Sequence, residues 1–166
     1  MKLKPLSKSA LPKALERAIH YRLLNEPWQA ESICKDILNA EPDNQSAIRT
    51  LILAITDKFE STENSGVPEL RELVLRLEDE YEQYYYKGII AERLGKSILS
   101  RATPRVRYIA HDHIQEAMRC YEKAESLAHD KQNEDSRLRW NACIRMIDEF
   151  NLQPAPESEP ERPFME

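Results

Sequence analysis

Apolar and polar residues follow one another along most of the chain with the period of an α-helix. Between residues 11 and 150, apolar side chains recur every three or four positions, which places them on one face of a helix. Prolines and short polar stretches interrupt this pattern. The interruptions separate seven predicted helices, over about 11–24, 27–41, 44–55, 68–77, 81–102 and 104–129, with a last one whose apolar positions run from 138 to 147. Thr103 and Pro104 predict the start of the sixth, as N-cap and first helical residue. The pattern therefore predicts an all-α fold, in which the fifth and sixth helices are the longest.

The two ends of the chain differ from this helical region. Residues 1–10 form a basic N-terminal segment, and residues 151–166 form an acidic tail in which prolines alternate with glutamates. Such a tail has too little apolar surface to offset the entropy lost on ordering, so we expect it to be disordered. One folded domain over residues 11–150 is predicted.

Small and aromatic residues recur at spacings that indicate internal repeats. Residues 11–44 have roughly the 34-residue length of one helical repeat, with Ala18 and Ala30 where its two helices would cross. Small residues are needed there because two helices approach closely only where a side chain is nearly absent. Further residues that fit the pattern are Tyr21 and Pro42 in the first repeat, Tyr84, Gly88, Gly95, Ala117, Tyr121 and Ala124 in the third, and Trp140 at the start of another.

On these residues the chain resembles the tetratricopeptide repeat (TPR) family, with Cys34 standing where a large aromatic residue is usual. The resemblance implies a right-handed, TPR-like solenoid of helical hairpins with about seven helices. Its third hairpin is lengthened by about two turns relative to the first. The middle hairpin, over 45–80, keeps only the apolar period.

The lengthened hairpin allows its helix crossing to be predicted. If the two helices run antiparallel with an apex near residues 102–103, glycine or alanine should face glycine or alanine. The expected pairs are Gly88 with Ala117, Gly95 with Ala110, and Tyr84 with Tyr121.

The TPR resemblance also implies a concave groove, lined by the first helix of each hairpin, in which a segment of a partner protein lies. By register the groove residues are Glu16, Ile19, Leu23, Arg49, Leu53, Tyr85, Tyr86, Ile89 and Arg93. Tyrosine and arginine are typical of interface hot spots. We therefore expect a protein–protein interaction module, an adaptor or chaperone-like scaffold. The alternative for Tyr85 and Ile89 is packing against the neighbouring repeat.

Basic residues gather towards the apex of the lengthened hairpin, at Lys96, Arg101, Arg105 and Arg107. They form either a solvated polar surface or a docking tip for an acidic protein or a nucleic acid. The net charge of −5 argues against extensive nucleic-acid binding. A third hypothesis is a self-assembling structural protein, a homo-oligomer formed through the outer face of the helix that carries Trp140.

The sequence indicates no catalytic chemistry, cofactor or metal site. We find no glycine-rich phosphate loop and no nucleophile placed beside a base, so we expect a protein that is not an enzyme. His111 and His113 would point to opposite sides of a helix and cannot chelate one ion. The three cysteines read as reduced core residues. No apolar run approaches the length of a membrane span, and we expect a cytoplasmic protein.

Overall fold

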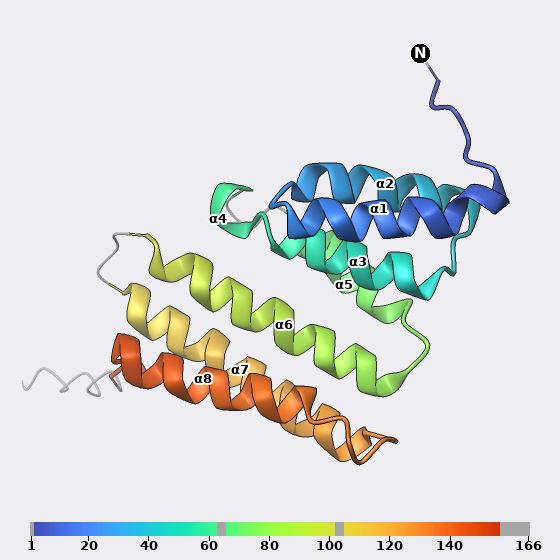
Figure 1. Ribbon diagram of the computed structural model, residues 1–166. Coiled ribbons are helices and arrows are strands. Elements are labelled where there is room, and N and C mark those ends of the chain that lie inside the picture. Colours follow the sequence, from blue (N-terminus) through green and yellow to red (C-terminus); the bar gives the residue numbers. More distant parts are fainter. Residues whose placement is uncertain (1, 63–65, 102–104, 157–166) are drawn as a thin grey trace, which may run out of the picture.

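The computed structural model describes residues 2–62, 66–101 and 105–156, and those residues form helices without any strand (Figure 1). Helices make up 76% of them, which confirms the all-α class. A short 3₁₀ helix, η1 (Lys8–Ala10), precedes the α-helices. These are α1 (Leu11–Leu23), α2 (Pro27–Ala40), α3 (Gln45–Thr56), α4 (Phe59–Thr62), α5 (Val67–Leu75), α6 (Glu80–Leu99), α7 (Val106–Leu127) and α8 (Asp135–Phe150).

Local signals in the sequence begin and end several of these helices. Asn44 caps α3 by accepting a hydrogen bond from the backbone N–H of Ala47 at 2.9 Å, and Asp79 caps α6 in the same way. Pro27 occupies the first turn of α2, where its missing N–H has no intrahelical partner. Asn25, at φ 59°, takes the left-handed conformation that turns the chain from α1 into α2.

The helices form two layers (Figure 1). The nearer layer in this view contains α1, α3, α6 and α8, and the farther layer contains α2, α5 and α7. Consecutive long helices pack against each other: α1 on α2, α2 on α3, α6 on α7, and α7 on α8. Helix α6 joins the two halves, because it also contacts α3 and α5.

Two main apolar cores follow from this packing. The first is centred on α3 and α5, where Ile52 and Leu70 are fully buried. The second lies among α6, α7 and α8 and buries Ile114, Tyr121 and Cys143. Tyr86 on α6 packs against both cores and so connects them.

The third hairpin is long, as the sequence predicted: α6 has 20 residues and α7 has 22, against 13 in α1 and 14 in α2. Its crossing matches the prediction at Gly95 and shows an unexpected contact at Gly88. A Cβ placed on Gly95 would lie 3.3 Å from the carbonyl oxygen of Ala110, as expected for facing small residues. A Cβ placed on Gly88, however, would lie 2.4 Å from the ring of Tyr121, so Gly88 makes room for that ring.

The prediction that Tyr84 faces Tyr121 is wrong. The neighbour of Tyr121 is Tyr85, with ring centroids 6.0 Å apart, whereas Tyr84 lies beneath the ammonium groups of Lys87 and Lys123. Gly88 and Tyr85 therefore both lie against the ring of Tyr121. Ala18, Ala30, Ala110 and Ala117 are all completely buried, as residues at helix crossings should be.

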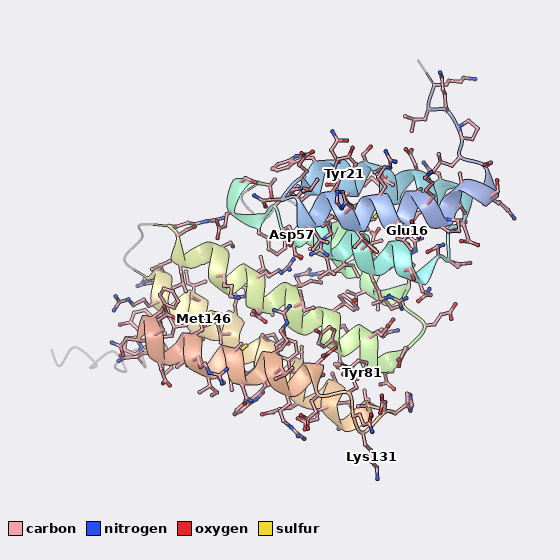
Figure 2. All side chains as sticks on the ribbon, viewed as in Figure 1. Glu16, Tyr21, Asp57, Tyr81, Lys131 and Met146 are labelled. Atoms are coloured by element: carbon pink, nitrogen blue, oxygen red, sulfur yellow. The ribbon has the colours of Figure 1, made fainter. Side chains whose placement is uncertain are left out.

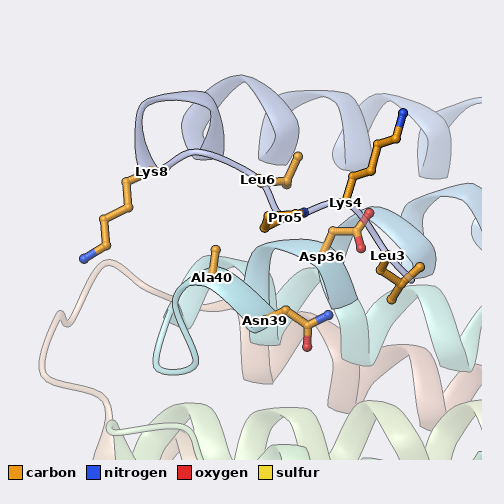
Figure 3. Close-up of a pocket in the computed structure, with 8 residues that line it drawn as sticks. All are labelled: Leu3, Lys4, Pro5, Leu6, Lys8, Asp36, Asn39 and Ala40. Carbon is orange, nitrogen blue, oxygen red and sulfur yellow. The ribbon is translucent and has the colours of Figure 1, made fainter. Parts of the chain in front are cut away.

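The chain ends are partly anchored. In Figure 3 the N-terminal segment lies along the end of α2, where Leu6 and Ala40 pack against a small core and a cleft of about 340 Å³ remains. At the other end Leu152 is 5% exposed and belongs to the second core, so the predicted tail boundary at residue 151 is too early. Residues 157–166 and the predicted helix start at Thr103 and Pro104 lie outside the described residues.

The sequence predicted no helix between residues 55 and 68, but the short α4 lies there and ends at Thr62. Phe59, which begins α4, is 2% exposed in the first core, and its burial holds this extra turn in place. In the parts of the chain that the structure describes, no helix is both long and apolar enough to cross a membrane.

Candidate functional site

The predicted groove residues lie on α1, α3 and α6, and for one of them, Ile89, the prediction is wrong. Ile19 and Leu23 are exposed on α1, by 43% and 80%. Glu16 is exposed beside them, and Arg49, Leu53, Tyr85, Tyr86 and Arg93 are half-buried. Ile89 is only 2% exposed, because it lies next to the α6–α7 crossing at Gly88 and packs in the second core. Ile89 is therefore a core residue and is unavailable to a partner.

Arg93 links α6 to the end of α3. Its Nη1 donates hydrogen bonds to the carbonyl oxygen of Leu53 at 3.0 Å, to Oγ1 of Thr56 at 2.5 Å and to Oδ1 of Asp57 at 2.6 Å. The guanidinium thus satisfies groups at the C-terminal end of a helix, where a positive charge is favourable. Because one side chain serves three acceptors, the orientation of Arg93 is well determined.

Asp57 extends this link to α1. Its second carboxylate oxygen accepts a hydrogen bond from Nε of Arg22 at 2.7 Å, so one carboxylate holds arginines from two helices. Figure 2 labels Asp57 where α3 ends, between α1 and α6. Burial lowers the pKa of Arg93, the Asp57 carboxylate opposes this, and the charges of Arg22 and Arg139 lower the pKa further. Arg93 therefore lies within the electric field of arginines on both α1 and α8.

Arg49 and two tyrosines continue the same face. Arg49 donates to both oxygens of Glu82 on α6, at 2.8 and 2.9 Å. Tyr86 stands edge-on to Tyr85, with centroids 5.4 Å apart, and burial with the nearby Glu82 charge raises the pKa of Tyr86 to about 12. Both phenols are therefore neutral near pH 7. We call Arg22, Arg49, Arg93 and Arg139, with Tyr85 and Tyr86, the arginine–tyrosine face.

A buried carboxylate, Glu92, contacts Arg139 of this face and residues of the helices behind it. Glu92 is completely buried on α6, yet it accepts hydrogen bonds from Tyr121 at 2.7 Å and from Lys96 at 2.8 Å. Nη1 of Arg139, on α8, lies 3.4 Å from the same carboxylate. Burial alone would raise the pKa of Glu92, but these donors and charges outweigh it and hold the pKa below its usual value. The network ties α6, α7 and α8 together.

The predicted basic tip is divided between two environments. The ammonium group of Lys96 is directed at Glu92 and belongs to the network just described. Arg101, Arg105 and Arg107 are exposed, and Arg105 and Arg107 flank the first residue of α7. Residues 102–104 at the apex lie outside the described residues.

The charge of the arginine–tyrosine face differs in sign from that of the whole chain. The ion pairs of this face join five basic groups, Arg22, Arg49, Arg93, Lys96 and Arg139, to three acidic groups, Asp57, Glu82 and Glu92. Asp135 adds a fourth acidic charge near Tyr85, which leaves an excess of one positive charge in a chain of net charge −5. The arginine side chains remain 20% to 35% exposed, so a ligand can reach them.

Sequence reasoning missed Arg22, Asp57, Glu92 and Arg139. A signal for Glu92 was present, because it lies four residues after Gly88 and three before Gly95, on the same face of the helix. An acidic residue between two crossing glycines must be buried, and hence must find donors. The other three meet only through the tertiary fold.

The described residues include no group of three or more histidine, cysteine or acidic side chains arranged to hold a metal ion. Burial raises the pKa of the Cys34 and Cys143 thiols to about 12, which keeps them protonated and unreactive. Burial also lowers the pKa of His113.

No protein-family model matches the chain, and neither the curated proteins nor the solved structures include a significant match.

Proposed function

We propose that this protein is a TPR-like solenoid of helical hairpins that binds an acidic segment of another protein on its arginine–tyrosine face. The observation that carries the proposal is the local excess of positive charge around Arg93, formed by arginines from α1, α3, α6 and α8 in a chain of opposite net charge. Complementary charge steers association and selects among partners.

Preorganisation also favours binding at this face. Arg93 and Arg49 are already fixed by hydrogen bonds to α3 and α6, so binding loses little additional side-chain entropy. Leu53, Tyr85 and Tyr86, on the same two helices as these arginines, are partly exposed and supply apolar surface. A partner segment of this chemistry carries carboxylates that flank an aromatic or aliphatic residue.

Selection from a displayed library of random 12-residue peptides tests the proposal. We expect wild-type protein to enrich peptides of net negative charge that contain an aromatic or large aliphatic residue. The double variant Arg49→Gln, Arg139→Gln should bind the enriched peptides at least ten times more weakly.

The matched control is Arg119→Gln, which removes an exposed arginine from α7 and should bind like wild type. Melting curves of all three proteins establish that each is folded. No enrichment of acidic peptides, or equal binding by the double variant and the control, would show that this face does not bind acidic segments.

A further inference from the structure

A second surface, on the side of α5 and α7, has different chemistry. There an open groove of about 430 Å³ lies between α5 and α7, with α6 as its floor. Its apolar lining consists of Val67, Val74, Leu75, Ile90, Ala91 and Leu94. Leu75, which also lines the groove, is 69% exposed and adds apolar surface that a partner could cover.

The unequal lengths of the helices explain why the groove is open. Helix α5 has 9 residues and α7 has 22, so the outer helix of the second hairpin covers only part of α6. Ile90 and Leu94 pack against the first core on one side and stay partly exposed on the other. An additional helix laid in the groove would bury them.

The charged groups that line the groove are mostly basic. Arg71 on α5 and Lys87 on α6 both line it. The lining carboxylate, Glu116, is already paired with Arg119 at 2.6 Å. Burial lowers the pKa of His113, so this lining residue is uncharged near pH 7. Net positive charge therefore borders an apolar floor.

We propose that this groove binds about two turns of an amphipathic helix from a partner protein, with its apolar stripe on the floor and acidic residues beside Arg71 and Lys87. The length follows from the lining of α6, which runs from Lys87 to Leu94, or roughly 12 Å at 1.5 Å per residue. Helix-in-groove recognition uses apolar anchors at positions i, i+3, i+4 and i+7, which two turns supply. The proposal is independent of the arginine–tyrosine face, because the two surfaces share none of these residues.

Two fluorescent 16-residue helical peptides with the same leucine stripe, one flanked by glutamates and the other by lysines, serve as probes in fluorescence anisotropy. We expect the full-length protein to bind the glutamate-flanked peptide at least ten times more tightly. Leu75→Glu should reduce that binding at least tenfold. The double charge reversal Arg71→Glu, Lys87→Glu should invert the preference in favour of the lysine-flanked peptide.

Leu138→Glu is the matched control, because Leu138 is also an exposed leucine, 63% accessible, but lies on α8. It should leave both affinities unchanged. Repeating the titrations in the Arg49→Gln, Arg139→Gln double variant removes any binding of the acidic probe at the arginine–tyrosine face, and the loss caused by Leu75→Glu should persist there. Equal binding of the two peptides, or equal losses in Leu75→Glu and Leu138→Glu, would overturn the proposal. Sedimentation of the wild-type protein as a dimer that Leu75→Glu dissociates would also overturn it, because a second copy would then occupy the groove.

Discussion

Substitution of Gly88 by alanine is expected to destabilise the protein, although the same change at Gly95 is not. Alanine is the better helix former by about 1 kcal/mol, so a solvent-exposed glycine would gain stability from it. At Gly88 the new methyl group would lie 2.4 Å from Cε1 and 2.7 Å from Cδ1 of Tyr121. At Gly95 the nearest atom is Cδ1 of Ile114, at 2.9 Å, which is the flexible end of its side chain.

The ring of Tyr121 cannot move aside easily. It is completely buried, and its hydroxyl donates to the Glu92 carboxylate at 2.7 Å. Overpacking of a rigid core group costs about 1–3 kcal/mol, and weakening a hydrogen bond to a charged group costs about 1.5–3 kcal/mol. After the helix gain of about 1 kcal/mol is subtracted, Gly88→Ala should lower the free energy of unfolding by about 1.5–5 kcal/mol. Gly95→Ala should change it by less than about 1 kcal/mol.

Urea denaturation followed by circular dichroism measures both differences. The same Gly88→Ala substitution in a Tyr121→Leu variant completes a double-mutant cycle. There it should lose most of its destabilising effect, because the tyrosine ring is absent. If Gly88→Ala were as stable as Gly95→Ala, or equally destabilising with and without the Tyr121 ring, the proposed crossing would be wrong.

Three further predictions follow from buried groups. Because folding lowers the pKa of Glu92, the ionised carboxylate contributes to the free energy of unfolding above the ordinary pKa of 4.5, and this contribution is lost as the pH falls through the lowered value. The difference in free energy of unfolding between wild type and Glu92→Gln, measured by urea titration at several pH values, should therefore become smaller on acidification. A difference that does not change with pH would contradict the lowered pKa. Leu152→Ala should lower the free energy of unfolding by about 2–4 kcal/mol, whereas deletion of residues 153–166 should leave the melting temperature unchanged. If the deletion lowered the melting temperature as much as Leu152→Ala does, further stabilising contacts would lie in the tail. The thiols of Cys34 and Cys143 should react with a thiol reagent at pH 8 only in urea, and rapid labelling of the native protein would show that they are accessible.

The helical period identified most of the fold. The first helix was predicted over 11–24 and spans Leu11–Leu23, because an amphipathic face and a turn-forming Asn25 are both visible in the sequence. Helix α8 extends beyond the apolar positions that predicted it, 138 to 147, because its first turn is polar and Asp148 and Glu149 separate Phe150 from that pattern. The short α4 was missed because it depends on the burial of Phe59 in a core assembled from distant helices.

The sequence identified some residues of the candidate site but not the partners that they contact. Register along a helix identified Arg49, Tyr85, Tyr86 and Arg93 as residues of one face. Their partners come from other helices, and the tilt between helices decides which side chains meet. At this crossing Gly88 meets the ring of Tyr121, and Ile89 is buried beside it.

The central claim is that the arginine–tyrosine face binds an acidic segment. The most direct test is a titration of the ¹⁵N-labelled protein with a glutamate-rich peptide that contains one tyrosine, followed by nuclear magnetic resonance. The Nε–H signals of Arg22, Arg93 and Arg139 report on the face itself, and that of Arg119 on the opposite layer serves as an internal control. We predict that the first three shift with a common saturation curve, while the Arg119 signal stays in place. Equal shifts of all four signals, or none in the first three, would contradict a specific acidic-segment site on this face.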